Sequence, residues 1–133
     1  VLARISKNYP SIVVDCEAGL EHLSRRTLLE VDWLVAVSDP SIRGLRTARR
    51  VGEVLEELKT RVRHRALIVN QMHGAMNDPQ KQAIKESRFD KVFYVPYDEG
   101  IKKMDESGGT VKDIGTESGI YKCVAEIMKQ IIL

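Results

Sequence analysis

The amino-acid sequence predicts an α/β fold in three layers, with a mainly parallel sheet covered by helices on both faces. Two observations support this. Four short runs rich in β-branched or aromatic residues are almost continuously apolar, as expected of strands buried on both faces. Amphipathic stretches with helical spacing separate these runs, and such alternation of strand and helix is typical of parallel sheets with right-handed crossovers.

The predicted elements follow one another closely along the chain. The strands are expected at residues 11–15, 33–37, 66–70 and 91–95. Asp39 and Pro40 form a start signal for a helix that runs to about Leu58. Asp78 and Pro79 give the same signal for a shorter helix ending near Ser87. Residues 98–104 and 116–132 are expected to form the two remaining helices.

Composition indicates one ordinary globular domain. The 133 residues are 43% hydrophobic and 30% charged, and 21 basic residues nearly balance 19 acidic ones. No apolar run reaches the roughly 20 residues that span a bilayer, and residues 1–4 do not resemble a signal peptide. We therefore expect a cytoplasmic protein with no membrane partner.

Neither the basic residues nor the cysteines predict a site of their own. The densest basic stretches, residues 43–50 and 59–65, are interrupted by acids. They are interpreted as a solvated helix face, with a phosphate- or partner-contacting patch as the alternative, and no nucleic-acid partner is expected. Cys16 and Cys123 are far apart, which argues against a disulfide framework or a self-contained zinc site.

The end of the first predicted strand carries the strongest chemical pattern. Four apolar or small residues lead to Asp15, and Gly19 follows four positions later. This is the pattern of a Walker B acid and a switch glycine. A carboxylate at a strand end can hold Mg²⁺ through water, and a glycine lets its N–H approach a γ-phosphate. The alternative is that Asp15 caps a helix or turn.

A longer stretch, from Asp15 through Glu17-Ala18-Gly19-Leu20-Glu21-His22 to Thr27, resembles the switch II region of the carbon monoxide dehydrogenase accessory ATPases. These CooC-type proteins of the MinD/ParA group of P-loop ATPases are implicated in nickel insertion. The resemblance continues through residues 38–48, 69–70 and 95–98, and so covers essentially the whole chain. It implies a P-loop NTPase-like fold.

The resemblance also implies roles for individual residues. Asp15 would be the catalytic acid associated with Mg²⁺ through water, and Gly19 the γ-phosphate sensor. Asn70 would hydrogen-bond the adenine edge, because an amide offers a donor and an acceptor side by side. Pro96 and Tyr97 would lie in the loop that closes over the base. Asn70 as a turn or helix cap is the alternative, and His73, in the loop that follows the predicted strand at 66–70, is interpreted as a bystander.

Two features of the family are missing from residues 1–133. One is the glycine-rich phosphate loop, and the other is the cysteine pair that could hold nickel or zinc in metal-handling relatives. The chain is therefore expected to be a single-domain fragment, the C-terminal part of a P-loop ATPase, that starts just before the Walker B strand. By itself it is expected to show no ATP affinity that calorimetry can measure.

The leading hypothesis is an ATP- and Mg²⁺-dependent homodimeric ATPase that acts as a metallochaperone for a client metalloenzyme. Nickel insertion into an enzyme like carbon monoxide dehydrogenase is the favoured task. One alternative is a MinD/ParA-type positioning ATPase, although the C-terminal helix lacks the basic face of a membrane-binding helix. Another is a Rossmann-like binding module without catalysis.

Overall fold

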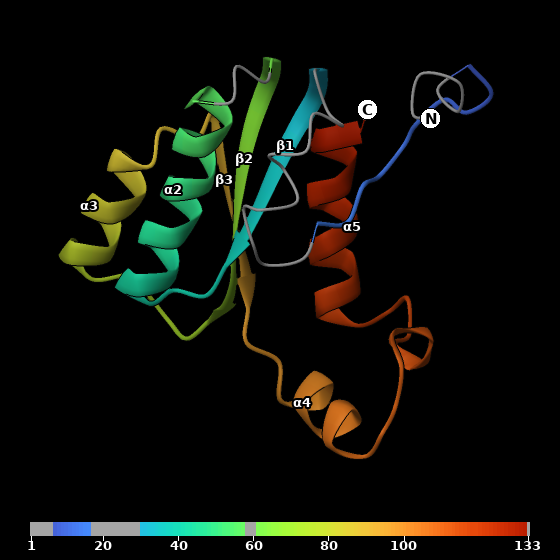
Figure 1. Ribbon diagram of the computed structural model, residues 1–133. Coiled ribbons are helices and arrows are strands. Elements are labelled where there is room, and N and C mark those ends of the chain that lie inside the picture. Colours follow the sequence, from blue (N-terminus) through green and yellow to red (C-terminus); the bar gives the residue numbers. More distant parts are fainter. Residues whose placement is uncertain (1–6, 17–29, 58–60, 133) are drawn as a thin grey trace.

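The computed structural model describes residues 7–16, 30–57 and 61–132 of the chain. Strands and helices alternate in the order that the sequence predicts (Figure 1). The elements are β1 (Glu30–Ser38), α2 (Ile42–Glu57), β2 (Arg61–Met72), α3 (Asp78–Glu86), β3 (Lys91–Pro96), α4 (Glu99–Glu106), the 3₁₀ turn η1 (Val111–Asp113) and α5 (Gly119–Ile132).

The three strands form one open parallel sheet in the order β1-β2-β3. Its register pairs Ala36 with Leu67 and Val69 with Tyr94. The ladder between β2 and β3 shifts between Val69 and Met72, where an irregularity interrupts it. All three strands therefore end at the same edge of the sheet, and α4 projects beyond that edge (Figure 1).

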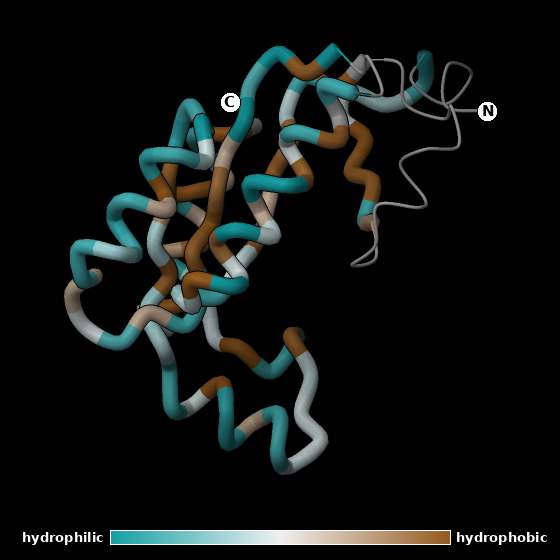
Figure 2. The backbone as a smooth tube through the Cα atoms, turned by 60° about the vertical axis from the view of Figure 1, so that its left-hand side comes forward, coloured by the Kyte–Doolittle hydropathy of each residue, from teal (hydrophilic) through white to brown (hydrophobic). Residues whose placement is uncertain are grey.

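Helices cover both faces of the sheet, so the predicted three-layer architecture is confirmed. On one face, Leu45 and Ala48 of α2 pack against Ala36, Leu67 and Val69, and residues of α3 border this cluster. On the other face, the side chains of α5 and the sheet form a second cluster, made of Ala66, Val95, Ile127 and Ile131. Figure 2 shows hydrophobic residues concentrated on the strands between these layers. No helix in the described ranges is long and apolar enough to span a bilayer.

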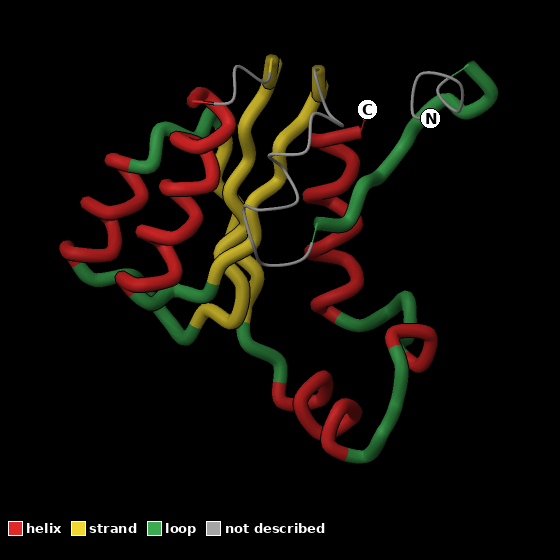
Figure 3. Tube along the Cα trace, in the orientation of Figure 1, coloured by secondary structure: helices red, strands yellow, loops and turns green. Residues whose placement is uncertain are grey.

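The predicted strand at residues 11–15 is not part of the sheet. The described residues 7–16 run as a loop outside the strands (Figure 3), and Val13 is 83% exposed. A β-branched run forms a strand only when a neighbour pairs with its backbone. Within the described part of the chain, β1 pairs with β2 alone, and no strand links β1 to residues 11–15. The prediction was therefore wrong for this segment.

The helices begin close to, but not always at, the predicted residues. Ser41 rather than Asp39 caps α2, since its Oγ accepts the N–H of Gly44 at 3.0 Å. Asn77 caps α3, because its Oδ1 accepts the N–H of Gln80 while the Gln80 Oε1 accepts the N–H of Asn77. Asp98 caps α4, and α5 begins at Gly119 rather than at residue 116. Each start is set by the nearest side chain that can accept a hydrogen bond.

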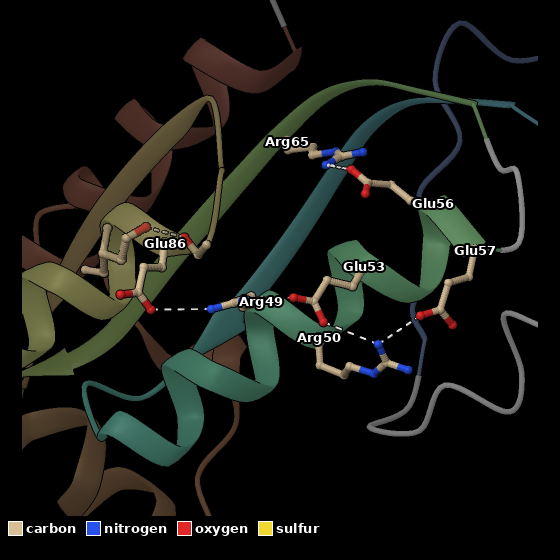
Figure 4. Close-up of polar contacts among 9 residues, drawn as sticks. Arg49, Arg50, Glu53, Glu56, Glu57, Arg65 and Glu86 are labelled. Carbon is tan, nitrogen blue, oxygen red and sulfur yellow. Dashed lines mark hydrogen bonds and ion pairs between the residues drawn. The ribbon is translucent and has the colours of Figure 1, made fainter.

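Ion pairs occupy much of the basic surface that the sequence singles out (Figure 4). Arg49 contacts Glu53 and also reaches Glu86 of α3, while Arg65 of β2 contacts Glu56 of α2 at 2.7 Å. Arg50 pairs with Glu53 and Glu57 in the same way. These pairs favour the interpretation as a solvated helix face over an open anion-binding patch, and exposed pairs of this kind stabilise a fold only weakly.

Candidate functional site

The carboxyl end of β2 carries Asn70 in an irregular piece of backbone. The Asn70 Oδ1 atom accepts the N–H of Gln71 at 2.9 Å, and Gln71 has a φ of +57°, which is uncommon for a residue other than glycine. Val69 packs in the cluster beneath α2, so strand alternation assigns Asn70 to the opposite face. The register shift between Val69 and Met72, called the β2 bulge below, therefore ends the regular ladder beside the side-chain amide of Asn70.

The end of β3 lies directly beside this bulge. Met72 pairs with Pro96 in the ladder, and the N–H of Tyr97 donates to the Met72 carbonyl oxygen at 3.0 Å. Asn70, Pro96 and Tyr97, which the sequence assigned to a base-binding site, therefore meet at one edge of the sheet. In open α/β sheets this edge is where ligands bind. Their roles toward a nucleotide stay predictions.

Tyr97 is held in part by His73, a loop residue for which the sequence predicts no functional role. The ring of His73 stacks on the ring of Tyr97 with centroids 4.2 Å apart and planes inclined by 29°. The Tyr97 hydroxyl donates to Glu99 Oε2 at 3.1 Å. Partial burial and the nearby Glu99 carboxylate raise the pKa of Tyr97 above its ordinary value. No local sequence signal marks His73, because the contact depends on how β2 and β3 align.

An open cavity of about 560 Å³ lies near the same edge, on the face that carries α3. It is mostly apolar, and Lys81 is the charged residue in its wall. The lining residues are Met72, Gly74, Ala75, Met76, Lys81, Tyr94 and Pro96. Asn70 and Tyr97 are not among them. Of the predicted site residues, the cavity therefore includes Pro96 alone.

The loop between β1 and α2 forms a third part of this edge. Ser38 Oγ donates to the Asp39 carbonyl oxygen, and Asp39 Oδ1 accepts the N–H of Ser41 at 2.8 Å. Hydrogen bonds from the side chain and backbone of Ser41 lower the pKa of Asp39. A Cβ atom added to Gly44 would lie 2.6 Å from Asp39 Oδ1, so a larger residue there would displace the carboxylate that accepts the Ser41 N–H.

The structure does not include Asp15 among the strand residues that end at this edge. Asp15 lies on the exposed segment outside the sheet, and Gly19 falls outside the described residues. Within the described ranges, no group of three or more His, Cys, Asp or Glu side chains could hold a metal ion. Cys16 and Cys123 are both free thiols.

Comparison with known proteins indicates what this arrangement is related to. No family model matches the chain. It is 32% identical over 132 residues to an uncharacterized ATP-binding protein of Methanocaldococcus jannaschii, covering 99% of this chain and 52% of the relative. A second uncharacterized ATP-binding protein of that organism is also 32% identical, over 96% of this chain and 48% of the relative.

A third relative has a more specific name. The carbon monoxide dehydrogenase accessory protein CooC of Rhodospirillum rubrum is 28% identical over 110 residues, which are 83% of this chain and 41% of the relative. The chain is related to CooC-like ATP-binding proteins. It spans about half the length of the curated relatives that it matches.

Proposed function

We propose that this chain is the base-binding part of an ATPase that assists metalloenzyme maturation. The observation that carries the proposal is the edge where Asn70, at the β2 bulge, lies beside Pro96 and Tyr97. It is supported by the names of the relatives, which are ATP-binding proteins and a carbon monoxide dehydrogenase accessory protein. Asn70 would read the adenine edge, and the loop after β3 would cover the base.

The chemistry of Asn70 suits this task. Its Oδ1 has a second lone pair beyond the one that accepts the Gln71 N–H, and its Nδ2 carries two donor hydrogens. An adenine presents the complementary acceptor and donor side by side on its edge. Because the bulge already holds the Asn70 amide against the backbone, little side-chain entropy remains to be lost when a base binds.

ATP hydrolysis would belong to a protein of the relatives' length that adds a phosphate-binding loop to these residues. Asp15 and Gly19 would then act as the acid and the γ-phosphate sensor that the resemblance implies. Such a protein would act as a homodimer inside the cell, deliver nickel to a client like carbon monoxide dehydrogenase, and handle the metal outside these 133 residues. The support for the client is the name of the Rhodospirillum rubrum relative.

A nucleotide-binding module without catalysis is the second candidate for the 133 residues alone. It is favoured because Asp15 lies on a segment outside the sheet, away from the ladder that holds Asn70. Catalytic and non-catalytic proteins would share the base-binding edge. The two candidates therefore differ only in turnover, which is measurable in a protein of the relatives' length.

The base-binding proposal can be tested on the chain itself by NMR. We expect weak binding of ATP, in the millimolar range and below what calorimetry detects, with amide shifts clustered at residues 70–73 and 97–98. Ribose 5-phosphate, which lacks the base, should leave these signals unchanged. Asn70→Asp, which replaces donor hydrogens with an acceptor, should reduce the shifts. Shifts confined to the cavity residues, or no shifts at all, would contradict the proposal.

A further inference from the structure

We propose that His73 is the stacking face for the purine base at this edge. The inference rests on the proposed function and assigns a residue that neither the sequence pattern nor the relatives single out. It also changes the expected role of Tyr97, which becomes the support for the His73 ring rather than the surface that contacts the base.

Three contacts hold Tyr97 in place. Its N–H donates to the Met72 carbonyl oxygen and its hydroxyl donates to Glu99. One face of its ring stacks on the imidazole of His73. Tyr97 is half-buried, whereas His73 is exposed. The outer face of this two-ring stack therefore belongs to His73, and an approaching planar ligand would meet the imidazole first.

The backbone places His73 beside the amide that would read the base. His73 follows Asn70 by three positions. Met72, which lies between them in the sequence, pairs with Pro96 of β3 in the ladder. Two left-handed residues, Gln71 with a φ of +57° and Gly74 with a φ of +67°, bracket the segment. Since glycine adopts this conformation without strain, Gly74 fixes the turn by which the chain leaves the edge after His73.

A stacking ring and a hydrogen-bonding amide are complementary requirements for one base. The amide recognises an edge in the plane of the base, and the ring contacts its face. Stacking of a base on an aromatic side chain is commonly worth about 1–3 kcal/mol by alanine substitution, or roughly a five- to hundredfold change in affinity. The apolar cavity on the α3 face contains an aromatic ring, that of Tyr94, but its walls contain no side-chain amide that could recognise the edge of the base.

The chain contains a matched control for this contact. His64 also contacts an aromatic ring, that of Trp33, in a tilted arrangement with centroids 4.7 Å apart and planes inclined by 31°. His64 lies in the first half of β2, nine positions before His73 and away from the strand ends. A ligand that binds at the carboxyl edge should affect the ring of His73 and not the ring of His64.

The experiment is an NMR titration of the 133-residue chain with adenosine 5′-monophosphate, observed at the histidine ring protons. Stacking predicts upfield shifts at His73 and none at His64. His73→Ala should reduce the initial slope of the Asn70 amide shift about tenfold, and His73→Phe, which keeps a planar ring, should restore it. His64→Ala should match the unsubstituted chain, and circular dichroism should verify that each variant folds.

The outcomes separate this inference from the proposed function. If Asn70 responds to the nucleotide while the His73 ring and the His73→Ala variant show no effect, the base binds but the stacking assignment is wrong. Upfield shifts at Tyr97 without any at His73 would return the stacking role to Tyr97. If neither Asn70 nor His73 responds, the proposed function itself fails.

Discussion

Gln80 of α3 donates a hydrogen bond from its Nε2 to the carbonyl oxygen of Pro40, at 2.7 Å and across 40 positions of the chain. The same side chain accepts the N–H of Asn77 through its Oε1. Gln80 therefore joins the loop after β1 to the loop after β2 and caps α3 at once. Two of the three loops at the proposed ligand edge are thus positioned by one side chain rather than by independent turns.

The first prediction concerns the close packing of the loop after β1. Gly44→Ala should lower the free energy of unfolding by about 1–3 kcal/mol, because the new methyl group would crowd Asp39 Oδ1 and Ser38 Oγ. Gly52→Ala is the control in the same helix, since a Cβ added there meets nothing within 4 Å. It should stabilise the protein by about 0.5–1 kcal/mol. Urea denaturation of both variants measures the difference, and equal effects would contradict the packing argument.

The second prediction concerns the core beneath α2. Leu67 is fully buried between the sheet and the helix layer, so Leu67→Ala should cost about 2–5 kcal/mol of unfolding free energy. Val111 is 79% exposed on η1, and Val111→Ala should change stability by less than about 0.5 kcal/mol. Thermal denaturation followed by circular dichroism checks both. If Leu67→Ala left the free energy of unfolding unchanged, this face of the sheet would be packed differently.

The third prediction concerns acid stability. Hydrogen bonds from Ser41 lower the pKa of Asp39 below its ordinary value of 3.8. The stabilisation from these bonds is therefore complete above about pH 4 to 5 and is lost as the pH falls through the lowered pKa. Asp39 is exposed, so we expect a small effect. Carboxyl NMR should show the Asp39 pKa rising toward its ordinary value in Ser41→Ala, where the side-chain hydrogen bond is gone. An unchanged pKa would contradict this cause.

The sequence was sufficient to predict the sheet but not the details of the ligand edge. The continuous apolar runs predicted β1, β2 and β3 correctly, as expected of strands in a parallel sheet, although Val35 and Val37 of β1 are exposed. Residues 11–15 show the same pattern, yet a strand also needs a partner, and no local pattern reveals whether one is present. The bulge at Gln71 and the contact between His73 and Tyr97 depend on how two distant strands align, which residue types alone do not determine.

The fourth prediction concerns catalysis in a protein of the relatives' length. We expect slow ATP hydrolysis, and we expect Asp15→Ala to abolish it because no other carboxylate is proposed to orient the attacking water. Phosphate release at saturating ATP is the measurement, and Asp32→Ala provides a control at another exposed carboxylate. Full turnover by the Asp15→Ala protein would show that the assigned role is wrong, without affecting the base-binding edge.

The central claim is that the base of a nucleotide binds where β2 and β3 end. Photolabelling with an azido-adenosine nucleotide, followed by mass spectrometry of the proteolysed chain, tests this most directly. If the base binds there, residues 70–73 and 96–98 should be labelled. Excess AMP should suppress this labelling, and ribose 5-phosphate should leave it in place. Suppressible labelling confined to Met76 and Lys81, in the cavity on the α3 face, would contradict it.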